Sequence, residues 1–328
     1  MYELAIGAII AALIFDFVNG FNDAANSVAT VIGTRVLKPL QAVLLSAFAN
    51  FAGPFVFGVA VATTISKGIL NPEDVTIYMI IAGLIGAISW ASLCTHFGLP
   101  ISVSHSLIGG LIGTALAAVG PEKLLSDGLM KVGIGIIASP FGGLVIGFLF
   151  AGAIITFFAR HHPRKVNNTF GRLQLISSAW FALTHGANDG QKTMGIIVLV
   201  LLTEGILTEF EVPIWVILAA ASSIALGTFI GGYKVIKTLG MRITRLKPYQ
   251  GFAAETAGGI ILAIFATLGI PASTTHAITG SIMGSGAVRR KWAVRWKVGR
   301  QIVFAWLITI PGSAVIAYLS TVVIHLFV

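Results

Sequence analysis

Charged residues are scarce in this 328-residue chain: Asp, Glu, Lys and Arg make up 10% of it, while hydrophobic residues make up 56%. Soluble domains carry about 25% charged residues, so the composition excludes an ordinary soluble protein. Cysteine is almost absent, and the single Cys94 excludes an intrachain disulfide framework. No basic segment precedes the first apolar run, so a cleaved signal peptide is not expected.

Long apolar runs, by contrast, recur roughly ten times along the chain, at the length that crosses a membrane. They predict an all-α polytopic membrane protein. Two of these runs, near 95–118 and 268–287, are short and rich in Gly, Pro, Ser and Thr. These two are expected to form re-entrant helical hairpins, in which case fewer segments cross the membrane completely.

The net charge of +9 comes mostly from four loops. Under the positive-inside rule these loops lie in the cytoplasm, and both termini are then extracytoplasmic. The chain is therefore expected in the plasma (inner) membrane, and a nucleic-acid partner is not expected. In the last basic stretch, Trp292 and Trp296 lie four residues apart, which predicts a helix at the lipid surface. The basic loops span 35–38, 160–172, 234–247 and 289–300.

Three sequence blocks occur twice in the same order, which indicates an internal duplication. Each copy contains five apolar segments, and an odd number places the second copy upside down in the membrane. The chain is therefore predicted to be an inverted-topology repeat, an architecture of many secondary transporters. The matching blocks are GFND at 20–23 with GAND at 186–189, GLPISVSH at 98–105 with GIPASTTH at 269–276, and Gly53/Gly58 with Gly227/Gly232.

The expected domain organisation follows from this duplication. Residues 1–160 form the first transmembrane repeat, 161–172 a short basic cytoplasmic loop, and 173–328 the second, inverted repeat. Substrates of such transporters bind near the membrane midplane, where the two copies meet.

Two polar motifs interrupt the apolar runs: GFNDAAN, which starts at Gly20, and GANDGQK, which starts at Gly186. A carboxylate at the centre of a membrane helix costs about 2.5–3.5 kcal/mol, so it persists only beside a partner, a cation or water. Each glycine is expected to break its helix and free backbone carbonyls. Asp23 and Asp189 would then lie among hard oxygen ligands.

Such ligands suit a small monovalent cation such as Na⁺, or a proton on the aspartate itself. No cysteine and no close histidine pair accompanies the motifs, which argues against zinc or iron. The alternative is that each aspartate only caps a broken helix. Glu255 is the only acidic residue in its segment and is either a cation ligand or a protonated relay. The candidate cation ligands are Asn22, Asp23, Asn26, Asn188, Asp189, Gln191 and Glu255, with sodium at Asp23 and Asp189.

The second duplicated block places hydroxyl residues directly after a proline, at the start of the next helix. Hydroxyls and free N–H groups at a helix N-terminus form an anion site, although ordinary helix capping is the alternative. The histidine in each block either titrates with the anion or is simply buried, and Lys192 either pairs with Asp189 or reaches the anion. The candidate anion ligands are Ser102, Ser104, His105, Ser273, Thr274, Thr275, His276 and Lys192.

The doubled Gly-x-Asn-Asp and Pro-x-Ser-x-x-His blocks resemble the inorganic phosphate transporter (PiT) family, in its compact prokaryotic sodium/phosphate symporter form. The resemblance covers nearly the whole chain. It implies that phosphate is the substrate and binds at the Ser/Thr tips, that cations bind at the Asn-Asp motifs, and that Asp23 and Asp189 are essential. Asn50 stands where eukaryotic members carry Glu, which leaves the number of cations per phosphate open.

The sequence therefore predicts a secondary active transporter that moves phosphate with sodium ions by alternating access. Proton-coupled or metal-phosphate symport is the main alternative, and an anion channel or an intramembrane hydrolase are further ones. No enzyme activity and no cofactor are expected, with sodium acting only as the coupling ion. Glycine-rich helix faces are compatible with a homodimer.

Overall fold

The computed structural model describes residues 2–231, 233–288 and 290–327, so Gly232 of the repeat comparison and Arg289 of the last basic loop lie outside the described residues. The α-helices are α1 (Tyr2–Gly33), α2 (Pro39–Ala52), α3 (Ala60–Lys67), α4 (Ile77–His96), α5 (Val103–Ala118), α6 (Ser126–Phe157), α7 (Pro163–Thr203), α8 (Ile214–Ile230), α9 (Tyr233–Lys237), α10 (Pro248–Leu268), α11 (Thr274–Ala287) and α12 (Trp296–His325). Short turns of helix are η1 (Gly53–Phe55), η2 (Pro72–Asp74), η3 (Pro121–Lys123), η4 (Thr238–Arg242) and η5 (Lys291–Ala293).

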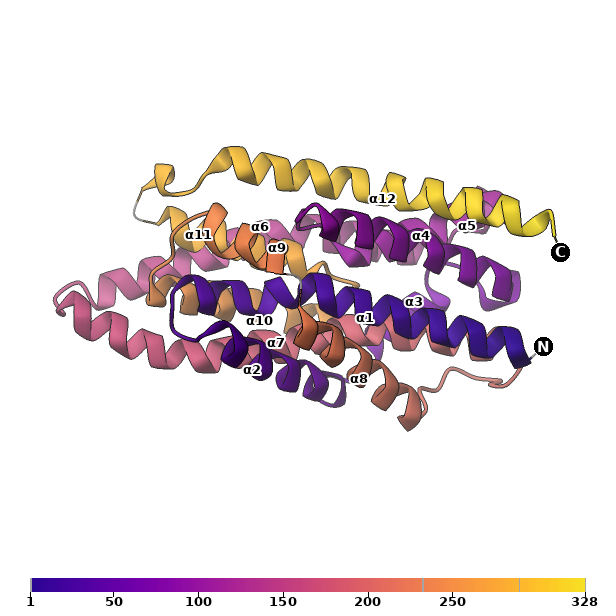
Figure 1. Cartoon of the computed structure of the whole chain (residues 1–328), viewed down its shortest axis with the longest axis horizontal. Coiled ribbons are helices and arrows are strands. Elements are labelled where there is room, and N and C mark those ends of the chain that lie inside the picture. Colours follow the sequence, from indigo (N-terminus) through magenta and orange to yellow (C-terminus); the bar gives the residue numbers. More distant parts are fainter. Residues whose placement is uncertain (1, 232, 289, 328) are drawn as a thin grey trace.

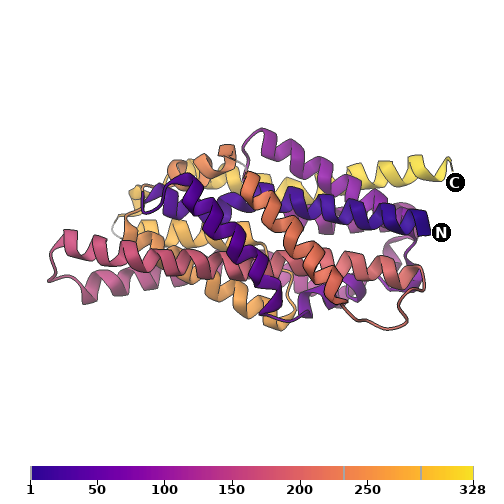
Figure 2. The same ribbon diagram turned by 60° about the horizontal axis from the view of Figure 1, so that its bottom comes forward.

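The long helices run roughly along one axis, which is the arrangement expected for a helical membrane protein (Figure 1). Within the described residues, five helices are long and apolar enough to cross a membrane, or up to seven spans if each of two bent pairs counts as one. Both termini lie at one end of the long axis, and the connection between α6 and α7 lies at the other (Figures 1 and 2). The all-α polytopic fold is confirmed.

α1 and α7 run unbroken through Gly20 and Gly186, so the expectation that these glycines break their helices is wrong. The glycines serve close helix packing instead. A Cβ at Gly20 would lie 2.3 Å from the carbonyl oxygen of Ile224 on α8, and one at Gly186 would lie 2.3 Å from that of Asn50 on α2. Each motif therefore lies on a continuous helix that packs closely against a neighbour.

Each half has one sharp bend, after α2 and η1 in the first half and after α8 in the second. α2 with η1 meets α3 at 74°, and α8 meets the α9–η4 segment at 66°. A glycine with positive φ lies at each bend, Gly58 at +72° and Gly231 at +63°, where other residues are strained.

The expected hairpins are present: α4 with α5, and α10 with α11. α5 has 16 residues and α11 has 14, fewer than the roughly 20 needed for a full crossing. Neither helix is therefore long enough to cross the membrane alone. A third element covers each tip. Thr64 of α3 donates to the carbonyl of Gly269 (2.7 Å), and Thr238 of η4 donates to that of Gly98 (3.1 Å).

Helices of the two halves also pack across the duplication. α5 packs on α12, and α11 packs on α6. Glycines permit both contacts: a Cβ at Gly113 would lie 2.1 Å from the Ala314 oxygen, and one at Gly284 would lie 2.0 Å from the Leu144 oxygen. Each half thus completes the other, while the orientation of the halves in the membrane stays a prediction.

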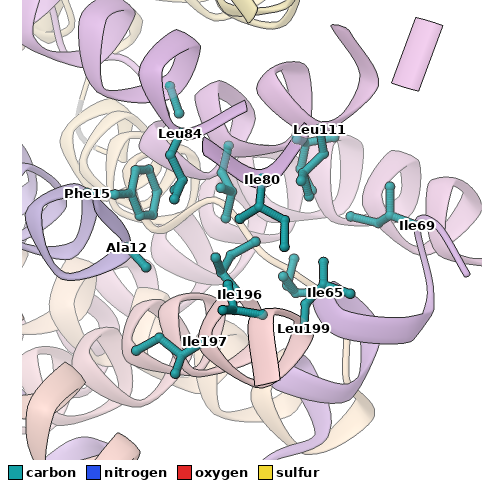
Figure 3. Packing of buried hydrophobic residues seen from close by; sticks show 14 of the residues in the cluster. Ala12, Phe15, Ile65, Ile69, Ile80, Leu84, Leu111, Ile196, Ile197 and Leu199 are labelled. Carbon is teal, nitrogen blue, oxygen red and sulfur yellow. The ribbon is translucent and has the colours of Figure 1, made fainter. Parts of the chain in front are cut away.

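The largest apolar core joins α1, α3, α4, α5 and α7 (Figure 3). Phe15, Ile80, Leu84 and Ile196 are almost fully buried within it. Because lipid tails are as apolar as these side chains, close van der Waals packing rather than removal from water makes this core hold α1 and α7 against the first hairpin.

Two predicted surface segments differ from expectation. Residues 163–172 of the predicted basic loop belong to α7, because Pro163 starts the helix and Phe170 packs into a small core with Ile154. The described residues of the stretch 288–300 do not form one surface helix; they follow α11 and contain the turn η5 and the start of α12. Val294 is buried there, and the Arg295 N–H donates to the Ile243 carbonyl (2.9 Å).

Candidate functional site

The duplicated motifs converge on one buried centre. Asp23 on α1 and Asp189 on α7 are at most 1% exposed. The Thr274 hydroxyl, in the first turn of α11, lies 3.1 Å from Asp23 Oδ2 and 3.2 Å from Asp189 Oδ2. The hydroxyl of Thr275 donates to Asp23 Oδ1 at 3.3 Å. The tip of the second hairpin thus bridges both carboxylates.

Lys192 lies one turn after Asp189 on α7 and is 1% exposed. Its ammonium donates to Asp189 Oδ1, to Ser104 Oγ (2.5 Å) and to the Ala272 carbonyl (2.9 Å). Ser104 Oγ also donates to the same carbonyl at 3.2 Å. The lysine therefore links α7 to the tips of both hairpins, and the expected pairing with Asp189 is present.

In the first motif the neutral amide of Asn26 contacts a hairpin-tip hydroxyl, as the Lys192 ammonium does in the second motif. Asn26 Nδ2 donates to Thr275 Oγ1 at 3.0 Å and lies 3.4 Å from Thr274 Oγ1. Asn26 is 1% exposed. The centre thus contains two carboxylates, one ammonium and several neutral donors.

His185 is a member of this centre that the sequence analysis missed. Its Nε2 lies 3.3 Å from Asp189 Oδ2 and 3.9 Å from Asp23 Oδ2, and its Nδ1 lies 3.0 Å from Asn50 Oδ1. Ligand atoms of Asp23, His185 and Asp189 all lie within 4.8 Å of one another, close enough to hold a metal ion. The available signal was the spacing: His185 precedes Asp189 by four residues, one helical turn.

The predicted anion ligands divide into two groups. Ser104, Thr274 and Thr275 lie at the centre. Ser102 and Ser273 cap their helices, because each side chain accepts a hydrogen bond from the backbone three residues later, at 3.2 Å. For these two serines the structure shows the capping alternative.

His105 and His276 contact each other rather than the carboxylates. Their ring centroids are 4.5 Å apart at 90°, and the His276 ring lies 3.7 Å from that of Trp306. His276 Nδ1 also lies 3.4 Å from the Ile136 carbonyl. Both rings are almost fully buried, so they help to join the two hairpins.

The remaining residues of the Asn-Asp motifs differ in their surroundings. Asn22 donates to Thr95, and Gln191 accepts from the Val61 backbone N–H (2.9 Å). Asn188 is fully buried, and neither polar atom of its amide has a hydrogen-bond partner among the described residues. Buried polar groups are nearly always satisfied, so this amide, directly before Asp189, marks a place where a ligand fits.

Glu255 on α10 belongs to a separate polar cluster. Its carboxylate accepts from Thr30 Oγ1 (2.5 Å), Gln174 Nε2 (3.0 Å) and the Ser177 hydroxyl. Three protein donors thus satisfy this buried group. The structure places it beside α1 and α7, but not among the groups that surround Asp23 and Asp189.

A cavity of about 470 Å³ lies beside α1 and reaches the first motif. Phe17, Phe21, Thr95, His96 and Lys234 are among its lining residues. Because Thr95 accepts the hydrogen bond of Asn22, the cavity wall contacts the residue directly before Asp23.

Chemically, the centre offers hydroxyl groups and two helix N-termini to an oxyanion, but it also presents two carboxylates. Like charges within a few ångströms repel strongly where water is excluded, so the carboxylates would oppose an anion. Lys192 offsets one negative charge, and a bound cation beside Asp23 would offset the other. The geometry therefore favours joint binding of anion and cation.

The chain is similar to proteins described as phosphate transporters. A family model described as the phosphate transporter family matches residues 19–317. A probable low-affinity inorganic phosphate transporter of Rhizobium meliloti is 48% identical over 319 residues, covering 97% of this chain and 96% of the relative. A protein of the same description from Bacillus subtilis is 38% identical, with 98% of each chain covered.

A solved structure also matches the fold. The structure titled "The sodium-dependent phosphate transporter" superimposes with a TM-score of 0.89 and 28% sequence identity. The match covers 99% of this chain and 100% of that one.

Proposed function

Because this chain belongs to the phosphate transporter family, as a multi-pass membrane transporter and not an enzyme, we propose that it carries inorganic phosphate together with sodium ions. The observation that carries the proposal is the approach of Asp23 and Asp189 to one hydroxyl of a hairpin tip. Without a bound cation, a phosphate held there would be repelled by the carboxylates.

In this proposal the hydroxyls of Ser104, Thr274 and Thr275 and the N-termini of α5 and α11 hold phosphate. Asp23, Asn26 and Asn188 provide oxygen atoms to sodium. Each ligand lowers the electrostatic cost of binding the other, and this coupling is reciprocal. Under this proposal sodium alone and phosphate alone bind more weakly than the two together, so the transporter moves them together.

Alternating access would act through the elements that cover the two hairpin tips. α3 covers the tip at Gly269, and η4 covers the tip at Gly98. Displacement of one cover at a time would open the centre to one side of the membrane. The cavity beside α1 lies on the η4 side, because Lys234 of α9, the helix directly before η4, lines it.

Proton-coupled transport is the second candidate. It is favoured by His185, whose Nε2 lies 3.3 Å from Asp189 and 3.9 Å from Asp23, because a histidine among buried carboxylates is typical of proton relays in membrane transporters.

Uptake of radiolabelled phosphate into proteoliposomes separates these functions. Under our proposal an inward sodium gradient drives uptake without a pH gradient, and Asp23→Asn abolishes it. Uptake driven only by a proton gradient would assign the second candidate. Phosphate flux that ignores both gradients would indicate a channel, and hydrolysis of an ester substrate by the pure protein would indicate a hydrolase.

A further inference from the structure

Lys192 and Asn26 occupy equivalent positions in the duplicated motifs. Each residue lies three positions after the aspartate of its motif, in GANDGQK and in GFNDAAN. The two motifs are otherwise similar, so the duplication provides an internal comparison between an ammonium and an amide at one position.

The two side chains also share one equivalent contact. Lys192 Nζ contacts Ser104 Oγ at 2.5 Å, and Asn26 Nδ2 contacts Thr275 Oγ1 at 3.0 Å. Ser104 and Thr275 are themselves matching residues of GLPISVSH and GIPASTTH. Each half-site therefore consists of an aspartate, a hydroxyl from a hairpin tip, and either Lys192 or Asn26.

The ligands of the Lys192 ammonium are those that suit a sodium ion. They are a carboxylate oxygen of Asp189, the hydroxyl oxygen of Ser104 and the backbone carbonyl oxygen of Ala272. All are hard oxygen donors, and the ammonium is 1% exposed. An ammonium group has three hydrogen-bond donors, and these three oxygen atoms use all of them. This arrangement favours pairing with Asp189, one of the two roles expected for Lys192, over direct contact with phosphate.

Among the described residues, Asp23 has no ammonium partner. Its oxygen atoms contact the neutral hydroxyls of Thr274 and Thr275, and the His185 ring lies 3.9 Å away. Of the two aspartates, Asp23 is therefore the one whose charge a mobile sodium ion would balance.

We propose that Lys192 is a tethered cation that occupies one of two equivalent sodium positions, leaving the Asp23 half-site as the one that binds a mobile ion. The inference rests on the proposed sodium-coupled function and deepens it. It means that this chain carries one sodium ion fewer per phosphate than a transporter with asparagine in both motifs. Because the lysine is part of the protein, its charge offsets part of the electrostatic cost of binding the anion in every transport cycle.

The variant Lys192→Asn tests this inference, because it gives the second motif the residue of the first. The reversal potential of phosphate transport in proteoliposomes reports the number of sodium ions per phosphate. We expect that number to rise by about one in Lys192→Asn, since each added coupled site adds one ion. The matched control Lys131→Asn removes the same charge from an exposed lysine on α6 and should leave the number unchanged. An unchanged number in Lys192→Asn would overturn the inference.

A stability measurement gives a second readout that does not require transport. Removal of the ammonium leaves Asp189 buried without its cation, so the purified variant should become strongly dependent on Na⁺ for folding. Its thermal midpoint in detergent should rise more steeply with NaCl than that of the unmodified protein, and choline chloride should not replace NaCl. A variant that stays unfolded at high NaCl, or that responds equally to choline, would show that Na⁺ does not take the ammonium's place.

The two proposals fail in different ways. If phosphate uptake by the unmodified protein ignores sodium, sodium coupling is wrong, whatever the variant shows. If uptake requires sodium but neither the stoichiometry nor the NaCl dependence changes in Lys192→Asn, only the role of Lys192 is wrong.

Discussion

Asp23 and Asp189 lie 166 positions apart in the sequence, yet both carboxylates are within 3.2 Å of the Thr274 hydroxyl. One hydroxyl cannot donate fully to both at once. Anything that binds one carboxylate therefore changes the hydrogen bonding of the other. This shared contact gives cation binding and hairpin position a direct physical link.

The two aspartates should differ in their effect on stability. Asp189→Asn leaves the Lys192 ammonium buried without a carboxylate, and loss of one partner from a buried ion pair costs about 3–5 kcal/mol. Asp23→Asn removes a carboxylate that has no ammonium partner and should cost less. Thermal midpoints of both purified variants provide the comparison, and equal losses would contradict the assigned pairing. Both variants should lose phosphate uptake.

Gly20→Ala and Gly186→Ala should both prevent normal folding. The added methyl carbon would lie 2.3 Å from a backbone oxygen of the adjacent helix, and a backbone cannot move aside as a flexible side chain can. The expected loss of folding free energy exceeds the roughly 1–3 kcal/mol that overpacking usually costs. Gly7→Ala on α1 is the control, because nothing lies within 4 Å of its Cβ position. Fluorescence-detected gel filtration after heating measures the folded fraction, and normal profiles for the first two variants would refute the close contact.

Glu255→Gln should lower stability without changing the number of sodium ions per phosphate. Thr30, Gln174 and Ser177 all donate to this carboxylate, and a glutamine amide would turn a donor toward one of them. An unsatisfied buried donor costs about 1–3 kcal/mol. Thr30→Val removes one donor and should cause a smaller loss. A changed sodium dependence in Glu255→Gln would instead support its expected role as a cation ligand.

An exposed ion pair joins the loops before α4 and before α6. The hydrogen bond from Lys123 to Asp74 (2.6 Å), together with the charge of that carboxylate, raises the pKa of the Lys123 ammonium. A raised folded-state pKa stabilises the fold below the unfolded pKa of about 10.4, and the effect is lost as pH rises through the folded pKa. Because the pair is exposed, Lys123→Ala should change the thermal midpoint only slightly, and less at high salt. A large change at neutral pH, absent in Lys131→Ala, would contradict this.

Several features of the fold could be predicted because they depend on local sequence. The apolar runs require helices in a membrane, and Pro100 and Pro271 require breaks before the short helices α5 and α11. The duplicated blocks also marked the two hairpin tips, which meet in the structure through His105 and His276. Predictions failed where local sequence allows two outcomes. A glycine in an apolar helix permits either a break or a close helix contact, and at Gly20 and Gly186 the neighbouring helices decide for contact.

The site shows the same division. The motifs identified Asp23, Asp189 and the tip hydroxyls, because a buried carboxylate without a function is too costly to persist. They did not identify His185, which in sequence is one more histidine in an apolar segment. Nor did they separate Ser102 and Ser273, which cap helices, from Ser104 and the threonines, which face the carboxylates.

The sequence by itself determined that this protein is helical, crosses the membrane and carries a duplicated pair of carboxylate motifs, because composition and repetition are properties of the chain alone. Only the tertiary structure decided which polar groups meet. Hydrogen bonds and charges act over a few ångströms, and residues such as Lys192 and Ser104 reach that distance through the packing of separate helices. The same packing sets Lys192 against three oxygen atoms and Glu255 against three donors, which gives two buried charges different roles.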